Sequence, residues 1–467
     1  MKIEQIYTGC LSQGAYYIES NGEAAIIDPL REVQIYLEKA EKDNAKIKYI
    51  FETHFHADFV SGHVTLSQKT AAPIVFGPQA HPNFDYYSAK DNEVFMIGDI
   101  TITALHTPGH TMESTCYLLK DKNGKNHSLF SGDTLFLGDV GRPDLAQKAA
   151  EITQEDLAGY LFDSLRNKIM ILEDEVIVYP AHGAGSACGK NLSKETVGSI
   201  GDQKKTNYAL RADMTKAEFI AEVTDGLQPP PSYFPVNIKL NKEGYQNVDE
   251  LIENIKSFDA KSFEVLATET EAVVLDVRHQ DDFSKGHIPN SIFIGIDGGF
   301  APWVGSLILD HKQPILLVCP ADRAVETVTR LARVGYDNVL GFLEGGFDSW
   351  VAAGFETDQI AFVLPTDLPS ILEKNGQIFD VRKPGEYESE HIENVPSTPL
   401  NFLNNHLAEF PKNEPFYIHC AGGYRSVIAA SILKSRGFHN VIDIKKGYAE
   451  IKNTSVKRTA NTCSSQQ

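Results

Sequence analysis

The feature that most limits how this chain can fold is an internal repeat in its C-terminal half. The stretch VVLDVRHQDDFSKGHIPNS is repeated as QIFDVRKPGEYESEHIENVPS, and LARVGYDNV is repeated as LKSRGFHNV. The offset is about 100 residues, the size of one small domain. Each copy opens with a β-type run, places another such run before a cysteine, and follows the cysteine with a helical pattern. We therefore expect two tandem α/β domains of parallel type, over residues 258–357 and 362–453.

The chain ahead of the repeat is long enough for another domain. It alternates β-type runs such as KYIFETH, DITITAL, HSLFSGD and EVIVYPAHG with helical spacing over residues 31–44 and 153–167. Thr153 is the expected N-cap of the second helix. The proline-dense segment LQPPPSYFP cannot sustain a helix interior or an inner strand. We expect a first domain over residues 1–235, a linker or adaptor over 236–257 with a short helix at 248–256, and a disordered tail over 455–467.

Charge and composition exclude several classes of function. The 467 residues are 42% hydrophobic, so the chain can bury substantial cores. With 43 Lys+Arg against 63 Asp+Glu the net charge is −20, which repels nucleic acid and anionic membrane surfaces. The first residues, MKIEQIYTGCLSQ, show no secretion signal, and no run reaches the ~18 apolar residues of a membrane span. We expect a cytoplasmic protein whose six scattered cysteines are reduced thiols.

Side chains that can bind a metal follow several β-type runs of the first domain. His54, His56 and Asp58 occupy alternate positions directly after KYIFE. Further donors are found in TPGHT, SGDTL and VYPAHG, namely His110, Asp133 and His182. Side chains at successive strand ends can converge on one ion, and imidazole with carboxylate is a common set of ligands. The sequence therefore predicts a metal site here.

With these motifs, about residues 1–230 resemble the metallo-β-lactamase superfamily. The resemblance implies an αββα sandwich in which an H-x-H-x-D-H motif, a later His, a bridging Asp and a final His hold one or two metals. Here Phe59 stands in place of the last histidine of that motif. Because a phenyl ring cannot coordinate, we do not expect a stable two-metal site.

Within that superfamily the chain is similar to the persulfide dioxygenases. The resemblance implies one Fe(II) per chain, held by His56, His110 and Asp133, with positions left open for dioxygen and substrate. His54, Asp58 and His182 would then orient ligands or waters from outside; the alternative is that they help to bind Zn in a hydrolytic site. Arg142, in VGRPD, resembles an arginine loop of this family, and we expect it either to attract an anionic substrate or to form a plain salt bridge.

The second copy of the repeat carries a candidate nucleophile. In FYIHCAGGYRS, Cys420 ends a strand and Arg425 opens the following helix. Inward-pointing backbone N–H groups, the helix N-terminus and the arginine all favour a thiolate. This copy resembles a rhodanese domain, which implies that Cys420 carries a persulfide and transfers its outer sulfur. The first copy resembles a rhodanese too, but its loop is one residue shorter.

That shorter loop predicts an inactive first copy. Its sequence is Cys319-Pro320-Ala321-Asp322-Arg323. Pro320 removes an amide donor, and Asp322 adds negative charge near the thiol, so both oppose an anionic sulfur. We expect Cys319 to be inert or weakly reactive and this domain to be a spacer or a docking element.

Taken together, the motifs resemble known fusions of persulfide dioxygenase with rhodanese. The resemblance implies oxidation of a low-molecular-weight thiol persulfide by O2 to sulfite and thiol, and formation of thiosulfate through Cys420, in sulfide detoxification. The thiol is left open among glutathione, coenzyme A and bacillithiol. Two alternatives stand beside this function: a zinc thioester hydrolase of the glyoxalase II type fused to a sulfurtransferase, and a non-catalytic sulfur relay. We expect a homo-oligomer with no nucleic acid or membrane partner.

Overall fold

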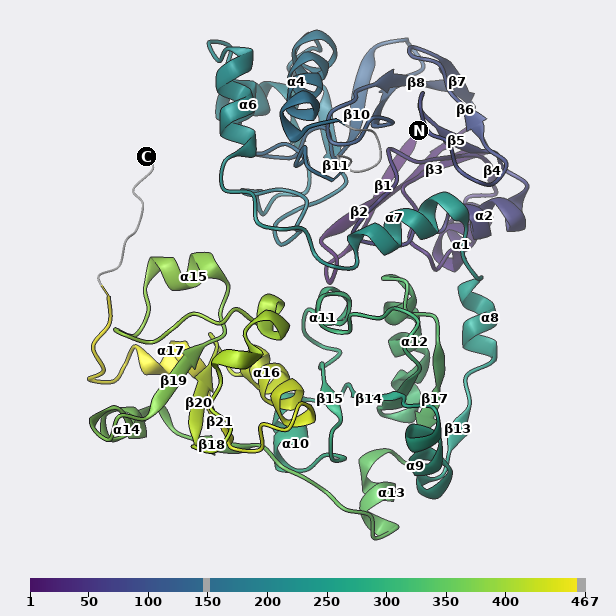
Figure 1. Cartoon of the computed structure of the whole chain (residues 1–467). Helices are drawn as coiled ribbons and strands as arrows, with labels where there is room; N and C mark the ends of the chain where they lie inside the picture. Colours follow the sequence, from purple (N-terminus) through teal and green to yellow (C-terminus); the bar gives the residue numbers. More distant parts are fainter. Residues whose placement is uncertain (146–151, 460–467) are drawn as a thin grey trace. The chain divides into compact units, whose positions relative to one another are not determined.

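The computed structural model describes residues 1–145 and 152–459, which form two compact units (Figure 1). Unit 1 contains Met1–Glu250 together with Ala332–Gly335, and unit 2 contains the rest of the chain. Unit 1 carries the predicted metal donors, and unit 2 carries both copies of the repeat apart from Ala332–Gly335. No helix in the described part of the chain is long and apolar enough to cross a bilayer.

Two six-stranded sheets pack face to face in unit 1. The first has the order β1-β2-β3-β4-β5-β6, with bounds Lys2–Thr8, Gln13–Ser20, Glu23–Ile27, Lys46–Phe51, Ile74–Phe76 and Tyr87–Ser88. The second has the order β12-β11-β10-β9-β8-β7; β7 to β12 span Val94–Ile97, Ile100–His106, Thr115–Lys120, Asn126–Gly132, Ile177–Pro180 and Gly198–Ser199. Apolar side chains of both sheets, among them Phe51, Tyr117 and Phe130, form one core between them.

Helices cover the outer faces of both sheets. Alternation along β2 shows how: Tyr16 and Ile18 lie in the core between the sheets, whereas Tyr17 packs with Tyr36 of the outer helix α1. The helices on the first sheet are α1 (Gln34–Lys42) and α2 (His63–Thr70). Those on the second sheet are α4 (Gln154–Ser164), continued by the π-helical η1 (Leu165–Ile169), α5 (Ile200–Thr206), the short η2 (Tyr208–Leu210) and α6 (Lys216–Thr224). The predicted αββα sandwich is confirmed, and Thr153 caps α4 as expected.

The proline-dense segment leads into a helix and does not end the unit. The helix α7 (Phe234–Glu243) has Pro235 in its first turn, where the missing N–H has no helical partner to lose. Phe234, Asn237 and Asn241 form a buried stripe along it. The helix α8 (Val248–Glu253) follows, and unit 1 continues to Glu250, beyond the boundary at residue 235 that we expected. Proline excludes a helix interior but favours a helix start, so a proline-dense segment can lead directly into α7.

Unit 2 contains two sheets in which all strand pairs are parallel. The first has the order β13-β17-β16-β14-β15; β13 to β17 span Ser257–Phe258, Val273–Asp276, Ile292–Phe293, Ile315–Val318 and Val339–Leu343. The second has the order β18-β21-β20-β19; β18 to β21 span Ala361–Val363, Gln377–Asp380, Phe416–His419 and Val441–Ile444. Two tandem parallel α/β domains are confirmed.

The helices of unit 2 follow the strands of each copy. In the first copy they are α9 (Ala260–Glu269), α10 (Gln280–Lys285), α11 (Phe300–Leu307), η3 (Ala321–Arg323), α12 (Ala324–Ala332) and α13 (Gly346–Ala352). In the second they are η4 (Pro365–Asp367), α14 (Leu368–Glu373), α15 (Pro384–Ser389), η5 (Leu400–Asn405), η6 (Leu407–Glu409), α16 (Tyr424–Ser435) and α17 (Gly447–Ile451).

Both copies use one buried ion pair to brace the turn after a strand. Arg382 binds the carboxylate of Asp380 and donates to the carbonyl of Glu390 at 2.8 Å. In the first copy, Arg278 and Asp276 make the corresponding contacts. These arginines therefore have a structural role.

The start of the expected disordered tail is ordered. Val456 is buried in the core of the second copy, and Arg458 pairs with Glu390 at 2.8 Å. Residues 460–467 lie outside the described part of the chain.

Candidate metal centre and sulfur-transfer loop

The predicted metal donors do meet, and they come from loops that follow separate strands. His54 follows β4, His110 follows β8 and Asp133 follows β10. These three are buried, and each offers a ligand atom within 4.8 Å of the others. A second buried group of the same kind contains His56, Asp58 and His182. Asp133 also groups with His182 and Cys188, so the two sets are adjacent.

His110 is oriented by the loop that carries Arg142. Its Nδ1–H donates to the carbonyl of Arg142 at 2.8 Å, which leaves the lone pair on Nε2. That Nε2 lies 3.4 Å from Asp133 Oδ2. Gly141 permits this approach, since a Cβ there would lie 2.0 Å from the carbonyl of Asp133 and 2.9 Å from His110 Nδ1. A hydrogen bond from Nδ1–H to a carbonyl fixes the tautomer in which Nε2 has no proton, and this is the tautomer that can bind a metal.

His54 and His182 are oriented in the same way. The Thr53 hydroxyl donates to Asp28, so its oxygen accepts from Nδ1–H of His54 at 3.0 Å. Nδ1–H of His182 donates to the carbonyl of Ser12 at 3.3 Å. Burial, together with the neighbouring imidazoles, holds the pKa of His54 well below its usual value, so this ring is neutral. Because Nδ1–H is the donor in both rings, the Nε2 lone pair of each ring is available to coordinate.

Unpaired buried atoms show that this constellation fits a metal ion. Nε2 of His110 and of His182, and both carboxylate oxygens of Asp133, lack a hydrogen-bond partner among the described residues. Burying such groups without partners is costly, and a cation would satisfy them together. Two imidazoles and one carboxylate suit Fe(II) and also Zn(II).

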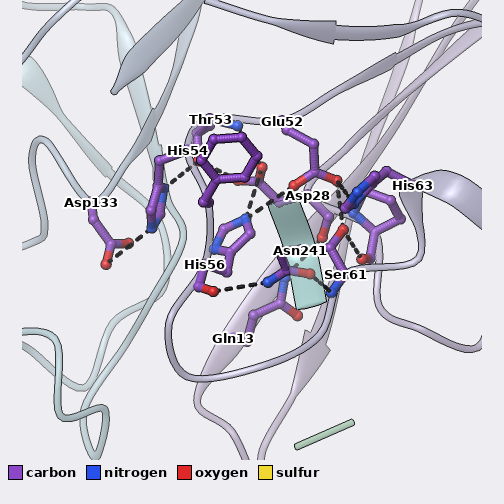
Figure 2. A network of polar contacts seen from close by, with 12 residues as sticks. Gln13, Asp28, Glu52, Thr53, His54, His56, Ser61, His63, Asp133 and Asn241 are labelled. Carbon is purple, nitrogen blue, oxygen red and sulfur yellow. Dashed lines mark hydrogen bonds and ion pairs between the residues drawn. The ribbon is translucent and has the colours of Figure 1, made fainter. Parts of the chain in front are cut away.

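We expected His56 to share one ion with His110 and Asp133. The structure instead groups His54 with these two residues. Nε2 of His56 lies 3.1 Å from Asp28 Oδ1 and 3.4 Å from Glu52 Oε2 (Figure 2). Burial opposes a charge on His56, but these two carboxylates outweigh it and hold its pKa well above the usual value. The correction has a physical reason: the alternating motif does not tell which ring faces the buried carboxylates.

Asp28 and Glu52 are buried carboxylates that contact this loop and that the metal-binding motif does not include. Glu52 also contacts His63 Nδ1 at 3.3 Å and accepts from the Ser61 hydroxyl at 2.5 Å (Figure 2). Both acids end β-type runs, EAAIID and KYIFE, and that position was a usable signal. They contact Thr53, His56 and Ser61 of the loop that carries the metal donors.

Phe59 is fully buried beside this group, with its ring centroid 4.4 Å from that of His56. It lies next to Asp58, whose Oδ2 is 3.5 Å from His182 Nε2. The phenyl ring offers no ligand, so the second group lacks an imidazole at this position.

Arg142 has no free charge to offer an anionic substrate. Its guanidinium pairs with both carboxylate oxygens of Asp144, at 2.6 and 2.7 Å, and donates to the carbonyls of Ala187 and Gln228. The expected substrate-binding role is thus replaced by the salt bridge that was its alternative. The physical reason is that Asp144 lies two residues away in the same loop and satisfies the fork of donors.

In unit 2, Cys420 lies where β20 meets α16. The N–H of Gly423 donates to its Sγ at 3.1 Å, and the thiol lies 3.6 Å from the Ser426 hydroxyl. Gly423 has φ 101°, which favours glycine. The Gly423 N–H is therefore aimed at the sulfur, and the helix N-terminus follows directly.

Arg425 does not act alone as a positive charge. It forms a two-pronged ion pair with Glu386 of α15, at 2.5 and 2.8 Å. Burial lowers the pKa of Arg425, but Glu386 and the nearby Cys420 more than offset this. The arginine is thus fixed beside the loop, with its charge shared by a carboxylate that the sequence did not reveal.

Cys319 has a different environment. Burial first, then Asp276 and Asp322, raise the pKa of this thiol to about 12. Arg323 is held by Asp297 and Glu326. These contacts oppose a thiolate at Cys319.

A buried carboxyl near the Cys420 loop was also missed. Asp443 on β21 is 5% exposed, and its Oδ1 has no hydrogen-bond partner in the described part of the chain. Burial raises its pKa from 3.8 to about 7, although Ser426 and Lys445 oppose the shift and Asp281 adds to it. Its position inside a β-type run gave no signal.

We expect Phe59→His to create a second metal site. The new imidazole would join Asp58, His182 and the bridging Asp133, the set that holds a second ion in the superfamily motif. After reconstitution with zinc and desalting, metal content should rise from about one to about two ions per chain. Phe59→Leu, which is apolar, is the control; equal metal content in both variants would contradict the prediction.

Asp443→Asn should make stability less dependent on pH. Because the folded-state pKa of Asp443 is raised, wild-type stability falls as pH rises from about 4 to about 7, by up to about 4 kcal/mol. An amide cannot ionise, so the variant should lose less stability over this window. Unfolding of the full chain at several pH values measures this, with the exposed Asp348→Asn as control; parallel curves for wild type and Asp443→Asn would refute it.

Family comparisons match the chain in two parts. Residues 8–182 match the metallo-beta-lactamase superfamily, and residues 259–353 and 364–454 each match the rhodanese-like domain. Among curated proteins, the cytoplasmic hydroxyacylglutathione hydrolase of Arabidopsis thaliana is 36% identical over 147 residues, which is 30% of this chain and 56% of that protein. A hydroxyacylglutathione hydrolase of Rhizobium johnstonii is 35% identical over 165 residues, 34% of this chain and 57% of that protein. The chain thus spans a little over half the length of these relatives.

One solved structure is similar over more of the chain. It is described as a metallo-beta-lactamase from Staphylococcus aureus subsp. aureus COL, is 32% identical, and has a TM-score of 0.66; the match covers 73% of this chain and 99% of that one. Together with the fold and the domain matches, this likeness identifies the chain as a member of the metallo-beta-lactamase superfamily in which two rhodanese-like domains follow the metal-binding domain.

Proposed function

We propose that this protein is a mononuclear iron persulfide dioxygenase coupled to a sulfurtransferase. The observation that carries the proposal is the pairing of a two-histidine, one-carboxylate set with Phe59. Such a set leaves positions open for dioxygen and a second reactant, and it is typical of non-haem iron oxygenases. The rhodanese-like domain supplies Cys420, which would accept the outer sulfur of a persulfide and transfer it to sulfite.

The proposed reaction balances as RSSH + O2 + H2O → RSH + SO3²⁻ + 2 H⁺. A ferrous ion held by His54, His110 and Asp133 would supply the activation of dioxygen toward the outer sulfur. The protein's own part is to hold both reactants in one geometry, and Phe59 keeps a second ion out. His182 Nε2 and Asp58 Oδ2, 3.5 Å apart, can accept a proton as sulfite forms.

Sulfur transfer follows at Cys420. Its thiolate attacks the outer sulfur of a second RSSH, the S–S bond breaks, and RSH leaves with the proton, so that Cys420 carries a persulfide. Sulfite then takes the outer sulfur, giving thiosulfate and restoring the thiolate. The Gly423 N–H, 3.1 Å from Sγ, supports the anionic sulfur in both steps.

A zinc thioester hydrolase fused to a sulfurtransferase is the second candidate, and the hydrolases among the curated relatives favour it. The experiment that separates the two combines metal analysis of protein purified anaerobically without added metal with oxygen uptake on glutathione, coenzyme A and bacillithiol persulfides. Iron with oxygen uptake supports the dioxygenase. Two zinc ions with no uptake, and hydrolysis of a glutathione thioester, would establish the hydrolase.

We expect Asp133→Ala and His54→Ala to separate the two activities. Each removes a ligand of the single ion, so iron content and oxygen uptake should fall to background, whereas sulfur transfer from thiosulfate to cyanide should persist. Cys420→Ser should do the opposite and leave sulfite as the accumulating product. These activities are measured with an oxygen electrode and by thiocyanate formation.

Cys319→Ser is the matched control for Cys420→Ser, since it makes the same change at the corresponding position of the first copy. It should alter neither activity, because burial and nearby carboxylates keep that thiol protonated. A strong loss of sulfur transfer in Cys319→Ser would contradict the assignment of Cys420 as the nucleophile.

A further inference from the structure

We infer that Asn241 is a positioning residue of the metal centre, although it lies outside the matched metallo-beta-lactamase segment. The structural basis is a set of contacts between the helix α7 and the backbone of the loop from His56 to Ser61. This inference rests on the metal centre of the proposed function and does not depend on the reaction carried out there.

The Asn241 side chain uses its whole amide on this loop. Its Nδ2 donates to the carbonyls of His56 and Phe59, both at 2.8 Å. Its Oδ1 accepts from the Ser61 N–H, also at 2.8 Å (Figure 2). An asparagine amide has two N–H donors and one acceptor oxygen, so each of these groups has a partner.

The loop held in this way carries the residues that distinguish this metal site. His56 and Asp58 belong to the second group of donors, and Phe59 fills the position of the absent imidazole. The three contacted backbone groups lie on both sides of Asp58 and Phe59. Fixing them limits how far the carboxylate and the phenyl ring can move relative to Asp133.

Packing holds Asn241 rigidly enough for that role. The residue is 1% exposed, and it lies on the same buried stripe of α7 as Phe234 and Asn237. Ile238, on the neighbouring turn, packs with Phe55 and Phe76. Apolar contacts therefore anchor the helix beside the loop from His56 to Ser61, here called the metal loop. The hydrogen bonds of the Asn241 amide then fix the orientation of that loop.

Asn237 supplies a matched control within the same helix. It lies one turn before Asn241 and is 0% exposed, but neither amide atom has a hydrogen-bond partner among the described residues. Replacing either asparagine by alanine removes the same atoms from the buried face of one helix. Only Asn241→Ala removes hydrogen bonds to the metal loop.

The test compares Asn241→Ala, Asn237→Ala and the wild type as full-length apoproteins loaded with Co(II). Affinity is measured by competition with a chelator, and ligand geometry by the visible absorption of Co(II). We expect Asn241→Ala to bind Co(II) about 10-fold more weakly and to change the absorption bands, because the loop that continues from His54 and carries Asp58 would no longer be fixed beside Asp133. Asn237→Ala should match the wild type in both readouts.

If Asn241→Ala does not fold, as judged by circular dichroism, Asn241→Asp replaces it. Aspartate has the same size and keeps an acceptor for the Ser61 N–H but loses both donors, so it should weaken Co(II) binding as well. Equal affinity and equal spectra for the Asn241 and Asn237 variants would overturn the inference. The Co(II) measurements use no persulfide and therefore test the metal centre alone. If they gave the expected result while the iron-loaded protein consumed no oxygen with any persulfide, only the proposed function would be contradicted.

Discussion

Burial of polar side chains in the loop after β4 is the constraint on which the rest of unit 1 depends. His54, His56, His63, Glu52 and Asp58 all lie in the interior, where an unpaired imidazole or carboxylate costs several kcal/mol. The protein meets this demand from two sides. On one side of the loop, Asp28 and Glu52 contact His56. On the other side, His54 and Asp58 lie close to His110, Asp133 and His182, and a cation could bind among these donors. The two sheets and α7 hold both sides in place.

Unit 2 shows how two copies of one scaffold can surround a cysteine with different charges and hydrogen-bond donors. Both copies have parallel sheets and the same Asp–Arg brace, and both place a cysteine after a central strand. At Cys420 a glycine N–H reaches the sulfur, whereas Pro320 cannot donate and Asp322 adds negative charge beside Cys319. The difference between the copies is therefore local electrostatics on a shared fold.

Much of this was accessible from the sequence because it is encoded locally. Strand periodicity, the cap at Thr153, the repeat and the two cysteine loops all depend on neighbouring residues. The expectations that failed depended on distant partners. The helix α7, most of which lies within residues 236–257 that we expected to be a linker or adaptor, packs into unit 1, and Arg142 is occupied by Asp144 and by carbonyls from other loops. The sequence could not distinguish His54 from His56, because Thr53 orients the first ring whereas the carboxylates of Asp28 and Glu52 contact the second.

The sequence by itself determined the kinds of domain, the set of metal donors and the contrast between Cys319 and Cys420, because residue type and short-range spacing carry that information. Only the tertiary structure decided which donors share an ion and which side chains hold them. Asp28, Asn241 and Glu386 reach their partners across separations in the chain that leave no periodic signal. A hydrogen bond depends on distance and direction in space, and those become defined only when the sheets and helices have packed.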